Sequence, residues 1–224
     1  MKIEITWLGH AAYRIKANDK IIYIDPRFMK AKGSKVKNFF ENPEKADIIL
    51  ITHHHADHCY AESFGKMINS QTIIIGPELC NKKLGNDYKK IIPGDKFSIY
   101  GINIQVVHAY NIHRRRSSGG LWHEKGNGVG YVISFDGKTI YHPGDTEFIS
   151  EMKNLGLIDL VFVPIDGKFT MNVDEAVIAV KEINPKIAVP MHIMDSNPIE
   201  FKDKIEKETS IKVMLLEWGE SILI

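Results

Sequence analysis

Apolar residues occur mainly in short runs along this chain, and Gly, Pro, Asn and Asp residues separate the runs. Short apolar runs between turn residues are typical of β-strands rather than helices. Two pairs, Asn18-Asp19 and Asp136-Gly137, predict tight turns between neighbouring strands. The predicted strands are Ile3–Leu8, Ala12–Ala17, Ile21–Ile24, Ile48–Thr52, Thr72–Ile75, Phe97–Tyr100, Ile102–His108, Val129–Phe135, Thr139–Tyr141, Leu160–Ile165 and Ile187–Met191.

Helical patterns are fewer. The clearest runs from 174 to 183, where Asn172 supplies a start signal and Asn184-Pro185 a stop signal. This helix lies between the last two predicted strands, which are fully apolar, and that order predicts a strand–helix–strand unit. Shorter helices are predicted over Pro77–Leu84 and Pro198–Glu208. Because no repeat or linker divides the chain, we predict one mixed α/β domain over residues 1–224.

Composition narrows the class of protein. The chain has 224 residues, of which 44% are hydrophobic and 25% charged, so a largely disordered protein is excluded. The formal net charge of +1 makes nucleic acid an unexpected partner. No apolar run approaches the roughly 20 residues that span a bilayer, and the N-terminus reads as a strand rather than a signal peptide. With only Cys59 and Cys80, we expect no disulfide scaffold and a cytoplasmic location.

Histidine is concentrated at one place. Of ten histidines, four lie between positions 53 and 58, in a segment that directly follows a predicted apolar strand. His53 and His55 are two positions apart, so in extended chain they point the same way. Asp57 and His58 follow where the chain turns, which allows them to reach a neighbouring ion. Imidazole and carboxylate groups suit zinc, iron and manganese, so this segment predicts a metal site rather than a surface histidine tract.

Three further ligand-type residues lie next to predicted strands. Asp145 follows one strand within a Pro-Gly turn, His192 ends another, and His123 precedes a glycine-rich approach to a third. Each is a weak signal alone, because a single histidine at a strand end is more often structural. Together with the histidine-rich segment, they place metal-ligand chemistry at four strand ends, as expected where rigid elements support functional loops.

These residues resemble a known pattern. The run His53-x-His55-x-Asp57-His58, followed by His123, Gly144-Asp145-Thr146 and His192, resembles the metallo-β-lactamase superfamily. Further segments resemble its branch of L-ascorbate-6-phosphate lactonase-like proteins and N-acyl-phosphatidylethanolamine phospholipase D. These segments are Trp7-Leu8-Gly9-His10, Ile24-Asp25-Pro26, Tyr141-His142-Pro143-Gly144-Asp145-Thr146 and Phe169-Thr170-Met171. The resemblance implies an α/β (α+β) fold, the four-layer αββα metallo-β-lactamase sandwich, with metals at one edge between the sheets.

The resemblance also implies a ligand set for two divalent ions per chain, with Zn²⁺ expected and Mn²⁺ or Fe²⁺ as alternatives. The first ion would be held by His53, His55 and His123, and the second by Asp57, His58 and His192, with Asp145 bridging them. His108 and His113 are rivals to His123, because the loop that follows His108 could fold over the site.

Other residues are expected to support these ligands. His10, Asp25 and His142 would contact the ligands from behind. Asp166 stands where the branch usually has glycine, and it is either a turn residue or an additional polar group near the metals. The basic segment Arg114-Arg115-Arg116 could recruit an anionic group of the substrate, or it is a solvated loop. No residue is assigned to substrate binding.

The expected activity is that of a metal-dependent hydrolase. A metal-bridging hydroxide would attack a small ester, lactone or phosphodiester, and Asp57 would orient it as a catalytic residue while binding the second ion. The alternatives are a nuclease of the tRNA 3′-processing type, an iron-dependent oxidative enzyme and a non-catalytic metal-binding protein. We expect a small-molecule substrate, and the sequence leaves a homo-oligomer open.

Overall fold

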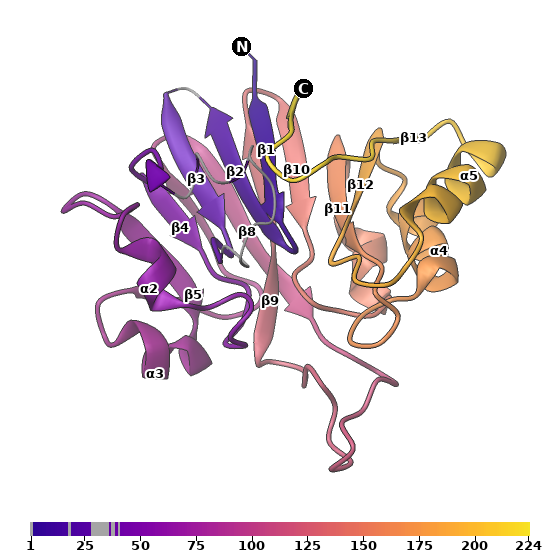
Figure 1. The fold of residues 1–224 in the computed structure, drawn as a ribbon, viewed down its shortest axis with the longest axis horizontal. Coiled ribbons are helices and arrows are strands. Elements are labelled where there is room, and N and C mark those ends of the chain that lie inside the picture. The colour runs from indigo at the N-terminus through magenta and orange to yellow at the C-terminus, as the bar shows by residue number, and fades with distance from the viewer. Residues whose placement is uncertain (1, 18, 28–35, 37–38, 40) are drawn as a thin grey trace. The chain divides into compact units, whose positions relative to one another are not determined.

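The computed structural model describes residues 2–17, 19–27, 36, 39 and 41–224. The chain divides into two compact units, one formed by Met1–Ile91 with Leu216–Ile224 and the other by Ile92–Leu215. Each unit is built on one mixed sheet that, among the described residues, has seven strands (Figure 1). Asn18, in the first predicted turn, lies outside the described residues. The single domain over 1–224 stays a prediction.

The sheet of the first unit has the strand order β14-β1-β2-β3-β4-β5-β6. Strands β14, β1, β2 and β3 pair antiparallel, whereas β3, β4, β5 and β6 pair parallel. The strands are β1 (Glu4–Gly9), β2 (Ala12–Ala17), β3 (Lys20–Ile24), β4 (Ile48–Leu50), β5 (Ile73–Pro77), β6 (Lys89–Ile91) and β14 (Ser221–Leu223). Short helices follow the parallel strands, namely α2 (Ala61–Phe64), the 3-10 helix η1 (Glu78–Cys80) and α3 (Asn81–Leu84).

The sheet of the second unit has the order β13-β12-β11-β10-β9-β8-β7. Strands β10 to β13 pair parallel, and β7 to β10 pair antiparallel. The strands are β7 (Lys96–Ile99), β8 (Ile102–Ala109), β9 (Gly128–Phe135), β10 (Lys138–His142), β11 (Leu160–Pro164), β12 (Ile187–Met191) and β13 (Lys212–Val213). Its helices are the 3-10 helix η2 (Ser150–Asn154), α4 (Val173–Ile183) and α5 (Pro198–Glu208).

The capping residues and the apolar face of α4 explain why residues 173–183 form a helix. Asn172 and Glu175 form a capping box, in which each side chain accepts a hydrogen bond from the other's backbone N–H. Asn184 closes the helix in the left-handed conformation. Between these ends, apolar residues such as Ala176 and Val180 pack in one core cluster with Val161 and Val163 of β11. No helix among the described residues is long and apolar enough to cross a membrane.

The eleven predicted strands are present, with bounds shifted by a few residues. The predicted strand–helix–strand unit is also confirmed, because β11 and β12 pair parallel with α4 between them in sequence. Sequence patterns miss β6, β13 and β14, which are only two or three residues long. Such strands carry no readable alternation, and backbone pairing with a neighbouring strand forms them.

Because of the strand directions, histidine and aspartate residues lie at one edge of each sheet. In the first unit β1, β3 and β4 run the same way, and His10, Asp25 and His53 follow their ends. In the second unit β10, β11 and β12 run the same way. Asp145, Asp166 and His192 follow these ends in turn, and His123 precedes the oppositely directed β9 at the same edge.

Candidate metal centre

The loop after β4 presents the histidines of the first unit. The ring atoms His53 Nε2 and His55 Nδ1 lie 3.1 Å apart. Two nitrogens that share one tetrahedral ion at about 2.0–2.1 Å are separated by about 3.3 Å. His53 is buried and His55 half-buried, so the pair has one side in the protein and one open. This geometry suits two ligands of one ion.

Asp25 directly follows β3, and its carboxylate holds the histidine loop in place. Its carboxylate accepts hydrogen bonds from Thr52 N at 2.8 Å and from Thr52 Oγ1 at 2.6 Å. The same carboxylate lies 2.7 Å from Nδ1 of His58. A carboxylate on one ring nitrogen fixes the tautomer and directs the other nitrogen toward a ligand position. Asp25 therefore orients His58 with Nε2 as the ligand atom.

Asp57 is partly exposed, and His10 lies against its carboxylate. Asp57 Oδ2 lies 3.2 Å from His10 Nε2, and the ligand atoms of His10, Asp57 and His58 all lie within 4.8 Å of one another. Glycine at position 9 allows the chain to place His10 beside Asp57. Gly9 has φ +104°, and a Cβ there would meet the Trp218 ring at 3.0 Å. Trp7 adds a hydrogen bond from Nε1 to His10 O at 3.0 Å.

Two basic side chains fix the backbone of the same loop. Lys83, on α3, donates from Nζ to His54 O at 2.6 Å. Arg27 donates to Ala56 O. Both acceptors lie between ligand residues, so these contacts hold the loop in the conformation that presents the ligands. Sequence reasoning did not identify either residue, because a lysine and an arginine far along the chain carry no local signal.

In the second unit, one carboxylate oxygen lies between two histidines. Asp145 Oδ2 is 3.3 Å from His123 Nε2 and 3.3 Å from His192 Nε2. All three residues are almost fully buried. Each separation matches that of two ligands on one ion, so a single carboxylate could serve two ions. This is the arrangement expected of a bridging ligand.

Asn111 decides which histidine reaches Asp145. Its side-chain Oδ1 accepts hydrogen bonds from the backbone N–H of His123 at 2.8 Å and from His123 Nδ1 at 2.7 Å. The ring is thereby oriented with Nε2 toward Asp145. His113 is exposed. His108 lies half-buried beside Tyr110, with ring centroids 6.2 Å apart. The geometry thus favours His123, and Asn111 is a site residue that the sequence analysis missed.

Asp166 does both things that the sequence left open. Its Oδ1 accepts hydrogen bonds from the backbone of Lys168 and Phe169, which makes a turn, and its Oδ2 lies 3.0 Å from His192 Nδ1. Burial acts to raise the pKa of Asp166, but His192 and Thr170 outweigh it, and the pKa is lowered below its ordinary value. Asp166 therefore orients His192 as Asp25 orients His58.

His142 supports the turn that carries Asp145. Its Nδ1 accepts a hydrogen bond from Gly144 N at 3.2 Å, and the residue is fully buried. Gly130 of β9 passes close to this turn, since a Cβ there would lie 2.9 Å from Pro143 O. This close approach accounts for one glycine of the glycine-rich stretch that leads into the first residues of β9.

Glu147 anchors the loop after β8, and sequence reasoning missed it. Its carboxylate accepts hydrogen bonds from the backbone N–H groups of Ile112, His113 and Arg114, at 2.9, 2.8 and 2.6 Å. Burial acts to raise the pKa of Glu147, but these N–H groups and the charge of Arg114 lower it overall. The Arg114 side chain pairs with Glu147 and Glu175, so this arginine is part of the framework rather than a solvated or anion-recruiting residue.

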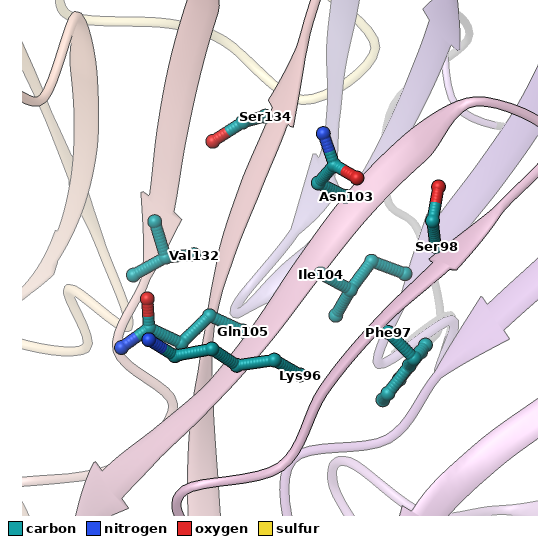
Figure 2. Close-up of a pocket in the computed structure, with 8 residues that line it drawn as sticks. All are labelled: Lys96, Phe97, Ser98, Asn103, Ile104, Gln105, Val132 and Ser134. Atoms are coloured by element: carbon teal, nitrogen blue, oxygen red, sulfur yellow. The ribbon is translucent and has the colours of Figure 1, made fainter.

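The donor set fits divalent metal. His58, His123 and His192 each have Nδ1 against a side-chain oxygen, and Nε2 is left as the ligand atom. Imidazole and carboxylate ligands with this outer support are those of zinc, manganese and iron sites. A separate cavity of about 400 Å³ lies on β7, β8 and β9 (Figure 2). Lys96, Gln105 and Ser134 are among its lining residues, and none of the candidate ligands is.

Two sheets of this topology, with histidine and aspartate ligands at their strand ends, define a metallo-β-lactamase fold. Residues 4–192 match the family model of the β-lactamase superfamily domain. The chain is also 32% identical over 237 residues to a UPF0173 metal-dependent hydrolase of Pelotomaculum thermopropionicum, covering 98% of this chain and 99% of the relative. The chain therefore belongs to the UPF0173 metal-dependent hydrolases of the metallo-β-lactamase superfamily, and it is a metal-dependent hydrolase of this fold. The predicted fold class is confirmed.

Solved structures agree. A protein from Parabacteroides distasonis, proposed to be a metal-dependent hydrolase, is 35% identical with a TM-score of 0.85, over 95% of this chain and 92% of the other. Igni18, a metallo hydrolase from Ignicoccus hospitalis, is 26% identical with a TM-score of 0.83, over 100% and 99% of the two chains. The similarity thus extends over nearly whole chains.

Proposed function

We propose that this chain is a binuclear hydrolase of a small ester, lactone or phosphodiester. The first ion is held by His53, His55 and His123, the second by Asp57, His58 and His192, and Asp145 bridges them. Zn²⁺ is the proposed metal, with Mn²⁺ and Fe²⁺ as alternatives. The observation that carries the proposal is the shared orientation of His58, His123 and His192, whose Nδ1 atoms all face buried oxygens.

The bound ions would supply a water of lowered pKa at neutral pH and would polarise the group under attack. The residues of the chain supply orientation. Asp57, held by His10, accepts a hydrogen bond from the reacting water and aligns it, which is the catalytic role we propose for this residue. Asp25, Asn111 and Asp166 hold the ligand rings, so little reorganisation is needed when charge develops.

The substrate class rests on the resemblance to the lactonase and phospholipase D branch, which we retain as part of the proposal. A small molecule agrees with the coarse class of metal-dependent hydrolase. Arg115 is exposed beside the second-unit ligands in sequence, so an anionic group on the substrate is part of the proposal. A cytoplasmic location remains a prediction, and a homo-oligomer stays open.

Metal content per chain tests the proposal first, measured by elemental mass spectrometry on untagged protein purified without chelator. We expect about two zinc or manganese ions per chain, followed by turnover in a screen of lactones, esters and phosphodiesters. One ion or none after supplementation would overturn the seven-ligand site. Iron as the main metal together with no turnover in this screen would favour an oxidative enzyme, and full zinc or manganese content without any turnover would favour a non-catalytic protein.

A further inference from the structure

An aromatic pair lies beside the ligand histidines of the second unit. The rings of Trp122 and Phe169 meet edge to face, with centroids 4.7 Å apart, and the Phe169 ring lies 6.4 Å from that of His192. Trp122 directly precedes the ligand His123 in sequence. Both aromatic side chains are half-buried, although a hydrolase needs neither of them to bind metal. Each residue therefore keeps a solvent-exposed part beside these histidines.

The residues that orient the ligands also hold the aromatic pair. Asn111 orients His123 through Oδ1 and donates from Nδ2 to Phe169 O at 2.9 Å. Asp166 lies against His192 and accepts a hydrogen bond from Phe169 N at 2.6 Å. Phe169 is thus tied to both ligand histidines through one side chain each. Part-buried hydrogen bonds to its backbone therefore fix the position of Phe169 relative to these ligands.

Trp122 is held in a similar way. Its backbone N donates to Arg114 O at 3.1 Å, within a hairpin closed by the Arg115–Leu121 bridge. Figure 1 shows the chain between β8 and β9 extending well beyond the ends of these strands. Two cations lie over the rings, Arg116 at 5.2 Å from the Trp122 centroid and Lys168 at 5.0 Å from that of Phe169. The aromatic pair and the two cations therefore combine apolar surface with positive charge.

We infer that Trp122 and Phe169 form the wall that binds an apolar group of the substrate, aromatic in preference, next to its reacting ester or lactone. The inference rests on the proposed function and specifies its substrate class: a carboxylic ester or lactone with an aryl substituent. Flat apolar groups gain both burial and edge contacts against such a pair, whereas a methyl group gains little. The cations at the wall favour an additional negative charge on the substrate.

Ligand affinity tests this without turnover. Phenylacetate and acetate serve as probes, titrated calorimetrically into full-length, metal-loaded protein. We expect phenylacetate to bind at least about tenfold more tightly than acetate, and Trp122→Leu and Phe169→Leu each to reduce that ratio roughly fivefold, as expected for loss of one aromatic contact. The matched control is Tyr100→Asn, which removes an exposed aromatic ring of the same unit. Tyr100 has φ +53°, a conformation that asparagine tolerates.

The outcomes separate this inference from the proposed function. A wild-type protein that does not distinguish the probes, or leucine variants that retain the full ratio, would overturn the inference. Equal loss of both probes in a variant would also overturn it, because the wall would then act only through the metal ligands. Thermal melting and metal content confirm that the variants fold and load. If the probe ratio behaves as expected but no ester or lactone is hydrolysed, the aromatic wall stands and the proposed function fails.

Discussion

The two units present their candidate metal ligands in opposite ways. The first unit carries His53, His55, Asp57 and His58 on one loop after β4, within six positions of sequence. The second unit assembles His123, Asp145 and His192 from three separate strand ends. Yet the outcome is similar, because a buried carboxylate next to a parallel strand end orients a ligand ring in each unit, Asp25 in the first and Asp166 in the second.

The comparison shows that the number of ligands in a segment and the accuracy of their positions have different sources. The loop of the first unit gains its ligands from local sequence and its shape from distant contacts such as that of Lys83. The second unit gains both from the sheet, since its ligands adjoin each other only when β9 to β12 have paired. Removing one residue should therefore have larger consequences in the second unit, where Asp145 contacts two ligands.

The largest effect is expected from Asp145→Ala. Because Asp145 Oδ2 lies 3.3 Å from both His123 and His192, its loss should remove most of the bound metal and lower kcat/KM about 10³-fold or more. His55→Ala, at the exposed side of the first-unit loop, should cost about one ion per chain. Elemental mass spectrometry and initial rates measure both. Equal metal content in the two variants would contradict a bridging role for Asp145.

The supporting carboxylates should rank next. Asp25→Asn and Asp166→Asn keep the size of the side chain but disturb the contact to His58 or His192. We expect each to weaken metal affinity about 10–100-fold, the usual cost of losing an outer partner of a metal ligand. Competition with a chromogenic chelator measures the affinity. Asp159→Asn is the matched control, since Asp159 pairs with Lys186 rather than with a ligand. No change in either test variant would contradict the orienting role.

Glu147→Gln should lower the free energy of unfolding rather than the rate of the reaction. The carboxylate accepts three backbone hydrogen bonds, so its neutralisation should cost about 1–2 kcal/mol of unfolding free energy near pH 7, measured with urea. The folded pKa of Glu147 is lowered, so this stabilisation is present above the unfolded value of about 4.3 and is lost as pH falls through the folded value. The difference in unfolding free energy between wild type and variant should therefore narrow as the pH falls below about 4.3, and a constant difference would contradict this account.

The smallest effect is expected from Lys83→Met. It removes one hydrogen bond to His54 O while keeping the length of the side chain. Metal affinity should fall roughly three- to tenfold, the cost of one hydrogen bond. Lys82→Met on the exposed side of α3 is the control and should leave affinity unchanged. If both variants behaved alike, general charge rather than the contact to the loop would be responsible.

Sequence patterns predicted eleven strands, the three-residue β4 among them, and the βαβ unit, because apolar runs and capping residues act locally. The short strands β6, β13 and β14 escaped, since backbone pairing with a neighbour, not side-chain pattern, forms them. The sequence also predicted the candidate ligands of the site, because these residues either cluster in the sequence or lie at the end of a strand. Arg27, Lys83, Asn111 and Glu147 were not, because their partners lie far away along the chain.

The sequence by itself therefore determined the class of this protein: histidine and aspartate at strand ends predicted a metal site, and the resemblance of their pattern to the metallo-β-lactamase superfamily implied a metal-dependent hydrolase. Only the tertiary structure decided that His123 rather than His108 or His113 adjoins Asp145, that Asp166 both turns the chain and orients His192, and that Arg114 belongs to the framework. The physical reason is that residue type fixes which atoms can bind metal. The pairing of strands distant in sequence fixes where those atoms point.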